Sequence, residues 1–144
     1  MCGLAGIWTF GSHLDPVINI AHRMADTLKH RGPDDFGVWK GDFDGPLLVH
    51  RRLSIRDLSE AGHQPMISSN RRFVIAFNGE IYNQHELRSA LPQITWRGHS
   101  DTETLLAAIE CWGLDSTLSR LVGMFSIALW DRSRMQLHLS LIHI

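Results

Sequence analysis

The sequence predicts a single domain of the α+β or layered α/β class, in which helices cover buried sheets. Two apolar runs, at residues 73–77 and 124–130, are nearly continuous, as is typical of strands with both faces covered. Segments with apolar residues at helical spacing separate them. The 144 residues, 44% of them hydrophobic, suffice for one hydrophobic core, and no repeat or linker marks an internal domain boundary.

The chain is expected to open with a strand and a helix. Residues 3–10 are apolar and glycine-rich, which indicates a buried strand. Asp15 followed by Pro16 is typical of a helix N-cap with proline at the first helical position. The turn-forming residues 30–34 end this helix. Its apolar face consists of Val17, Ile20, Ala21, Met24 and Leu28.

Short strands and a second helix are expected in the middle of the chain. The strands lie at 36–40, 46–50 and 73–77, and a helix over 84–91 precedes a strand-like segment at 94–96. The last part of the chain begins with a further helix.

Ser100 and Glu103 have the spacing of a capping box, which predicts a helix that starts there and ends at Gly113. A short helical segment near 115–121 leads into the strand at 124–130. The apolar residues that follow the capping box are Leu105, Leu106, Ile109 and Trp112.

Composition narrows the classes of function. The formal net charge of -1 gives no electrostatic indication of a nucleic-acid partner. No apolar run approaches the ~20 residues that span a bilayer, so no membrane association is expected. The start lacks the features of a signal peptide, and two cysteines are too few for a disulfide framework, so a cytoplasmic location is expected.

No metal or cofactor is expected in this domain. The nine histidines include no HExxH motif, because His85-Glu86 lacks the second histidine, and there is no glycine-rich phosphate loop. Cys111 is expected to be a small core residue on its helix. Core or pocket-wall positions are expected for Trp8, Trp39, Trp96, Trp112 and Trp130.

Cys2 is the most informative residue for chemistry. Removal of Met1, usual before a small residue, would leave a thiol and a free α-amine on the same residue. Their pKa values, ~8.5 and ~7.7–8.0, allow the amine to accept the thiol proton near neutral pH. One residue would then supply nucleophile and general base, as in N-terminal threonine enzymes. Most Met-Cys starts, however, have no catalytic meaning.

Asn78-Gly79-Glu80 follows the apolar strand at 73–77 directly. Asn-Gly is the favoured two-residue hairpin turn, which is one interpretation. The other is that the Asn78 amide and the Gly79 N–H together form an oxyanion hole. Because a rigid turn is a good place to fix donors, the two interpretations are compatible.

Arg52 and Asp101 suit the two charged ends of a free amino acid. Arg52 is either a surface arginine at a strand end or the bidentate partner of a carboxylate. Asp101 is favoured at the first turn of its helix by the helix dipole, and in the functional interpretation it faces a substrate ammonium.

Six segments occur in an order that resembles class II glutamine amidotransferase domains, and within that group glutamine-hydrolysing asparagine synthetase. The resemblance covers residues 2–138. The segments are CGLAGIW at the start, HRGPDD at 30–35, HRRLSIRDLSEAGHQPM at 50–66, FNGEIYN at 77–83, GHSDTET at 98–104 and VGMFSIALWD at 122–131.

The resemblance implies a four-layer αββα N-terminal-nucleophile hydrolase fold, with two stacked antiparallel sheets flanked by helices. It implies that Cys2 attacks the side-chain amide of L-glutamine, and that the γ-glutamyl thioester is hydrolysed to glutamate. The roles that the motifs imply are the following: Asn78 and Gly79 as the oxyanion hole, Arg52 for the α-carboxylate, Asp101 and Glu80 for the α-ammonium, and Leu53 and Ile55 as pocket lining.

In such enzymes ammonia passes to a C-terminal synthetase domain that uses ATP and Mg²⁺ to make asparagine. That domain is absent, so the expected partners are L-glutamine and the synthetase domain of the parent chain, and a homodimer is left open. The alternatives are a glutaminase domain serving a different acceptor, and an inactive fragment that acts only as an interaction domain.

The end of the chain departs from the family pattern. Residues 1–138 are expected to form an incomplete glutaminase domain. The segment 139–144, LSLIHI, is expected to be a non-native tail, because the transposon end used in some sequencing libraries encodes these residues. The alternative is a final strand, since Leu137, Leu139 and Leu141 alternate.

Overall fold

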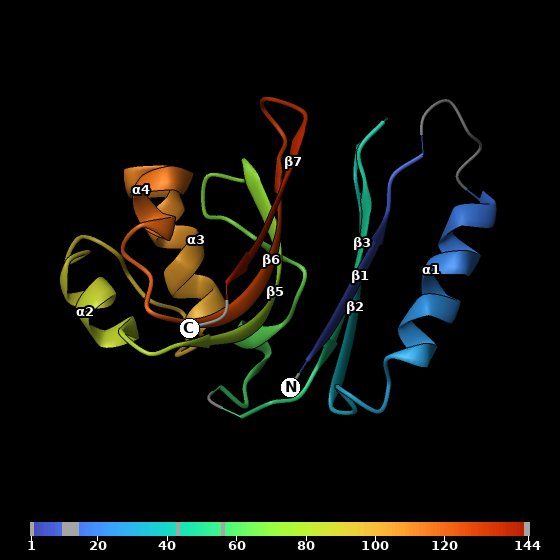
Figure 1. Cartoon of the computed structure of the whole chain (residues 1–144), viewed down its shortest axis with the longest axis horizontal. Helices are drawn as coiled ribbons and strands as arrows, with labels where there is room; N and C mark the ends of the chain where they lie inside the picture. The colour runs from blue at the N-terminus through green and yellow to red at the C-terminus, as the bar shows by residue number, and fades with distance from the viewer. Residues whose placement is uncertain (1, 10–14, 43, 56, 143–144) are drawn as a thin grey trace.

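The computed structural model describes residues 2–9, 15–42, 44–55 and 57–142. Four layers lie face to face: a helix, a three-stranded sheet, a four-stranded sheet and a group of helices (Figure 1). Both sheets are antiparallel, so the stacked arrangement that the sequence predicted is confirmed. None of the helices in the described ranges combines the length and apolar character that crossing a bilayer requires.

The three-stranded sheet has the order β1-β3-β2, with β1 at Gly3–Ile7, β2 at Asp35–Lys40 and β3 at Leu47–Arg52. Helix α1, Asp15–Thr27, covers its outer face (Figure 1). Side chains alternate along a strand, so Leu47 and Val49 of β3 face α1, whereas Leu48 faces the other sheet. The buried residues between α1 and the sheet are Val17, Ala21, Ala25, Leu47 and Val49.

The four-stranded sheet has the order β4-β5-β6-β7. Strands β5, Phe73–Ile81, and β6, Gly123–Asp131, pair along their whole lengths. Strand β4, Met66–Ile67, flanks β5, and β7, Gln136–Ile142, flanks β6. Residues 139–142 of the predicted tail therefore belong to a strand, in agreement with the final-strand interpretation, and residues 143–144 lie outside the described part of the chain. The proposed non-native origin of the tail stays a prediction.

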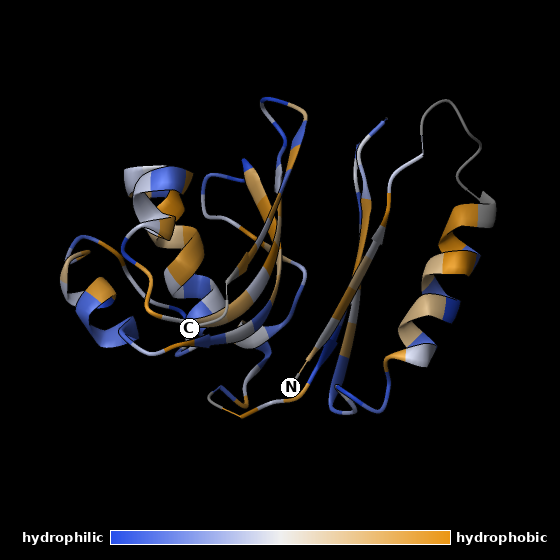
Figure 2. Ribbon diagram, viewed as in Figure 1, coloured by the Kyte–Doolittle hydropathy of each residue, from blue (hydrophilic) through white to orange (hydrophobic). Residues whose placement is uncertain are grey.

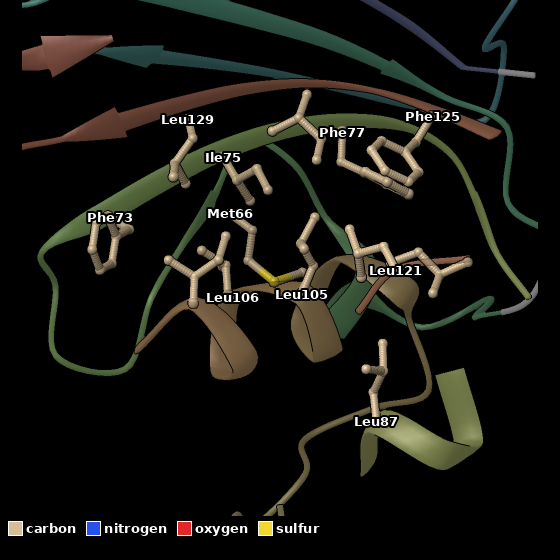
Figure 3. Close-up of a cluster of buried hydrophobic side chains, with 13 residues drawn as sticks. Met66, Phe73, Ile75, Phe77, Leu87, Leu105, Leu106, Leu121, Phe125 and Leu129 are labelled. Carbon is tan, nitrogen blue, oxygen red and sulfur yellow. The ribbon is translucent and has the colours of Figure 1, made fainter. Parts of the chain in front are cut away.

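Three helices cover the outer face of this sheet: α2 at Gln84–Ser89, α3 at Asp101–Trp112 and α4 at Leu114–Leu118. Figure 3 shows side chains from α3, β5 and β6 pointing toward one another in the largest apolar cluster. Figure 2 shows apolar residues along the strands and hydrophilic residues in the connecting loops. Packing in this cluster holds α3 against β5.

The two sheets pack on each other through a second cluster. Its buried members are Leu48, Val74, Ala76, Ala128 and Trp130. Trp130 is 1% exposed, and Trp8 packs edge-on against it, with ring centroids 5.1 Å apart. The other tryptophans are half-buried, in agreement with core or wall positions.

Several local predictions were wrong. The opening strand ends at Ile7, before residue 10. Residues 94–96 form no strand, because the chain there packs against α2 and α3: Arg88 stacks on the Trp96 ring at 4.1 Å. Cys111 is exposed, because it lies on α3 away from the apolar face and accepts a hydrogen bond from Gln93.

The predicted ends of α3 are confirmed. Ser100 caps α3 by accepting a hydrogen bond from the Glu103 N–H at 3.2 Å, as the capping box predicted, and α3 ends at Gly113. The Glu103 carboxylate reaches back to the backbone N–H groups of Arg97 and Gly98. The N-cap interpretation of Asp15 depends on a side chain outside the described part of the chain.

We expect Trp130→Ala to lower the free energy of unfolding by about 3–5 kcal/mol, because it empties the centre of the contact between the sheets. Urea denaturation measures this loss. Trp96→Ala is the control, since Trp96 lies outside that contact and should cost much less. Equal losses for the two variants would contradict the assignment of Trp130 to the inter-sheet core.

Candidate active site

Cys2 lies at the N-terminal end of β1, beside the residue that follows β3. Its Sγ accepts a hydrogen bond from the Leu53 N–H at 3.3 Å and lies 3.7 Å from the Leu53 carbonyl oxygen, to which the thiol can donate. The Cys2 carbonyl accepts a bond from Arg31 Nε at 3.1 Å. The residue is half-buried, so the thiol is held in place and still reachable. Met1 lies outside the described residues.

Asn78 and Gly79 lie inside β5, where they pair with Ser126 and Phe125 of β6. The hairpin-turn interpretation of Asn78-Gly79 is therefore wrong, because pairing with β6 overrides the local turn preference. Gly79 has a φ of 156°, and a Cβ there would lie 2.3 Å from the Met124 carbonyl oxygen. Only glycine fits this approach of the two strands.

The peptide groups of Phe77, directly before Asn78, are held by two buried side chains. Gln64 Oε1 accepts the Phe77 N–H at 2.7 Å, and His50 Nε2 lies 2.9 Å from the Phe77 carbonyl oxygen. Because that oxygen only accepts, His50 Nε2 must carry the proton. His50 comes from β3 of the other sheet, and Gln64 comes from the segment directly before β4. They fix the backbone that presents Asn78.

Arg52, the last residue of β3, is 8% exposed, so its interpretation as a surface arginine is wrong. Its Nη1 donates to the Ser59 carbonyl at 2.9 Å, and its Nη2 donates to the Asp57 carbonyl. The loop after β3 thus folds back around the guanidinium. This loop includes a short 3₁₀ helix, η1, at Glu60–Gly62.

Asp101 is the first residue of α3 and is 6% exposed. Its Oδ2 accepts the N–H of Ile81, the last residue of β5, at 2.9 Å. This bond joins the start of the helix to the strand that carries Asn78 and Gly79. Glu80 lies on the same strand and is exposed.

One cavity of about 180 Å³ brings these residues together. Its volume is below the ~300–1,000 Å³ of pockets for drug-sized ligands, so it suits a smaller molecule. Ile55, 72% exposed, lies at its rim. Every residue that the sequence predicted for the site lines this cavity: Cys2, Arg52, Leu53, Ile55, Asn78, Gly79, Glu80 and Asp101.

Several lining residues were missed by the sequence analysis. They are Asp57, Gly62, Gln64, Phe77, Ser100, Thr102 and Met124. Three of them, Asp57, Gly62 and Gln64, lie in the sequence segments RDL and GHQP. Their position within a family motif was the only sequence feature that could have indicated a role in the site. A neighbouring cavity shares Cys2, Asn78, Gly79 and Met124 and opens toward Leu4 and Leu141. The Cys2 side chain therefore borders space on two sides.

Among the described residues that line the cavity, Arg52 has a cationic side chain, and Asp57, Glu80 and Asp101 have carboxyl groups. Burial raises the pKa of the Asp57 carboxyl, but hydrogen bonds from the Ser59 hydroxyl and from the backbone N–H groups of His99 and Ser59 outweigh it and lower that pKa to about 2. Asp57 is thus ionised at neutral pH. A ligand with a carboxylate and an ammonium finds counterparts for both charges in Arg52 and Asp101.

Burial lowers the pKa of His50 to about 4, because the space between the sheets disfavours the charged ring. Its Nδ1 is buried and has no hydrogen-bond partner among the described residues. Elsewhere in the described ranges, no three His, Cys, Asp or Glu side chains gather closely enough to bind a metal ion.

The chain is similar in sequence to a known protein family and to several characterised proteins. A family model described as glutamine amidotransferase domain matches residues 1–141. The chain is 40% identical over 141 residues to asparagine synthetase [glutamine-hydrolyzing] 3 of Bacillus subtilis, covering 93% of this chain and 22% of that protein. It is 35% identical over 147 residues to amidase chry2 of Gibberella zeae, covering 95% of this chain and 22% of that protein.

The chain thus spans about a fifth of the length of these relatives. Among solved structures, it is similar to glutamine phosphoribosylpyrophosphate amidotransferase from B. subtilis, with a TM-score of 0.69 and 20% identity. That match covers 90% of this chain and 35% of the other. At this identity the likeness shows the fold alone.

We expect the free energy of unfolding to fall by about 3 kcal/mol between pH 7 and pH 4 because of His50. The unfolded chain binds the proton near pH 6.5, whereas the folded chain binds it only near pH 4. The stabilisation is therefore complete above pH 6.5 and is lost as the pH falls toward 4. Urea denaturation across this range measures it.

His50→Gln should flatten this pH dependence, since glutamine can still donate to the Phe77 carbonyl and does not titrate. His85→Gln is the control, because His85 is exposed on α2 and its loss should leave the slope unchanged. Parallel curves for the wild-type protein and His50→Gln would show that His50 is not buried in its neutral form.

Proposed function

This chain belongs to the glutamine amidotransferase domain family, and on that premise we propose that it is a glutaminase that converts L-glutamine to glutamate and ammonia. One observation carries the proposal: a half-buried N-terminal thiol, backbone and amide donors, and two opposite charges line a single small cavity. Free glutamine offers a group for each: a side-chain amide, an α-carboxylate and an α-ammonium.

Cys2 is the proposed nucleophile after removal of Met1. The α-amine accepts the thiol proton, and Sγ forms a bond to the side-chain carbonyl carbon of glutamine. The electron pair of the C=O bond moves to oxygen, where the Asn78 amide and the Gly79 N–H stabilise it. Collapse of this intermediate breaks the C–N bond, and the ammonium group of Cys2 returns its proton to the departing ammonia.

A γ-glutamyl thioester then joins Cys2 to the substrate. Water attacks the same carbon and gives its proton to the α-amine, and the same donors hold the second oxyanion. The C–S bond breaks, the thiol regains the proton, and glutamate leaves. The proton therefore passes back and forth between two groups of one residue, and the reaction needs no cofactor in this domain.

The two countercharges orient the substrate. We assign the α-carboxylate to Arg52 and the α-ammonium to Asp101, with Glu80 assisting. Leu53 and Ile55 contact the aliphatic part of the side chain. Burial strengthens both charge interactions, because Arg52 and Asp101 are each less than a tenth exposed. An amino acid held at both ends places its amide at Cys2.

The ammonia is proposed to serve asparagine synthesis by an ATP- and Mg²⁺-dependent domain in the parent protein, in a cytoplasmic setting. The name of the B. subtilis relative supports that acceptor. The amidase from G. zeae, similar at nearly the same coverage, favours a second candidate: the same glutaminase serving a different acceptor. Transfer of ¹⁵N from amide-labelled glutamine in the full-length parent would separate the two.

The glutaminase proposal predicts that Asn78→Ala lowers kcat about 10²–10³-fold and leaves KM nearly unchanged, because the lost donor acts on the oxyanion rather than on bound glutamine. Glutamate release measured over a range of glutamine concentrations gives both constants. Asn19→Ala, which alters an exposed asparagine of α1, should behave as wild type. A variant of Asn78 with raised KM and normal kcat would remove Asn78 from the oxyanion hole.

A further inference from the structure

We propose that Asp57 is a positioning residue that sets the spacing between Arg52 and Asp101. This inference rests on the proposed function, because it concerns the two charges assigned to the ends of glutamine. Asp57 lies in the loop after β3, between Arg52 and η1, and lines the cavity. Its backbone contacts one of the two charged residues, and its side chain contacts the segment that leads to the other.

On the Arg52 side, the Asp57 carbonyl accepts a hydrogen bond from Arg52 Nη2. The Asp57 carboxylate also organises the turn that supplies the second acceptor. Its Oδ1 accepts bonds from the Ser59 N–H at 2.8 Å and the Ser59 hydroxyl at 2.6 Å. The Ser59 carbonyl in turn accepts Arg52 Nη1 at 2.9 Å. Asp57 thus fixes both carbonyl groups that hold the guanidinium.

On the Asp101 side, Asp57 Oδ2 accepts the N–H of His99 at 2.7 Å. His99 precedes the capping residue Ser100, and Asp101 follows directly. The segment is packed tightly here, since a Cβ on Gly98 would lie 2.4 Å from Asp57 Oδ2. Arg88 holds the other side by donating to the Gly98 carbonyl at 2.9 Å. The start of α3 is therefore set against the Asp57 carboxylate.

The carboxylate itself has the character of a structural bridge. Asp57 is 7% exposed, and each carboxylate oxygen already accepts a hydrogen bond from the protein. Its pKa of about 2 keeps it ionised throughout the neutral range, so both oxygens stay acceptors. Asp101 and Glu80, the carboxylates assigned to the substrate ammonium, come from α3 and β5 and line the same cavity.

Spacing matters because the α-carboxylate and α-ammonium of an amino acid are attached to one carbon. Their separation is fixed, so two rigid countercharges bind both groups well only at the matching distance. Without the bridge, the loop that holds Arg52 and the start of α3 can move apart. A ligand with one charge needs only one countercharge, so its affinity does not depend on the separation between Arg52 and Asp101.

Asp57→Asn is the test, in a Cys2→Ala background that prevents turnover. Calorimetry measures binding of three ligands: L-glutamine, glutaramate, which lacks the ammonium, and γ-aminobutyramide, which lacks the carboxylate. We expect the affinity for L-glutamine to fall about tenfold or more, because asparagine has a single acceptor oxygen, which cannot accept from both the His99 N–H and the Ser59 groups. The affinities for the two single-charge ligands should change less than threefold.

Ser59→Ala provides a milder variant if Asp57→Asn is too unstable to measure. It removes one bond to Oδ1 and keeps the bond to His99, so it should give the same selective pattern with a smaller loss. Asp115→Asn is the matched control, because Asp115 is exposed on α4, and all three affinities should equal those of the background.

The possible outcomes distinguish the role of Asp57 from the proposed glutaminase function. Equal losses for the three ligands, or no loss for any, would overturn the role of Asp57 and leave the glutaminase proposal standing. A background protein that binds no L-glutamine would overturn the proposed function, and the role of Asp57 with it. A loss confined to the doubly charged ligand supports both.

Discussion

The antiparallel ladder between β1 and β3 is the constraint on which the site depends. It pairs Gly3 with Arg51, so Cys2, directly before β1, lies beside the residues at the end of β3. The thiol then contacts the backbone of Leu53, and Arg52 is its close neighbour. A shift of one residue in this ladder would turn every side chain of β1 to the other face and separate the thiol from its surroundings.

The second sheet brings the remaining groups to the same place. Leu48 of β3 packs in one buried cluster with residues of β5 and β6, which stacks the two sheets. His50 and Gln64 bind the polar groups of Phe77 on β5. Asn78 and Gly79 follow on the same strand, and Asp101 is tied to its last residue. Sheet packing, two buried side chains and one helix cap therefore determine the geometry, and the cavity lies where the ends of these elements meet.

The sequence predicted the parts of this structure that local patterns specify. The buried strands, the Ser100 cap and the shared position of Cys2, Arg52, Asn78 and Asp101 were predicted, the last by the resemblance of ordered motifs. Local patterns failed where tertiary contacts decide. Asn78-Gly79 has the chemistry of a turn, but pairing with β6 makes it part of a strand. The bridge through Asp57 joins residues 42 positions apart, and the motifs that contain Asp57 and His99 do not indicate that these two residues meet.

The proposed glutaminase chemistry requires Cys2, with a free amine, to be the nucleophile. Intact-mass analysis after incubation with the glutamine analogue 6-diazo-5-oxo-norleucine tests it most directly. Cys111 is an internal reference, because it is an exposed thiol remote from the cavity. We expect a chain without Met1 that carries a single adduct on Cys2, whereas iodoacetamide should also label Cys111. No adduct on the folded protein, or an adduct on Cys111 instead, would contradict it.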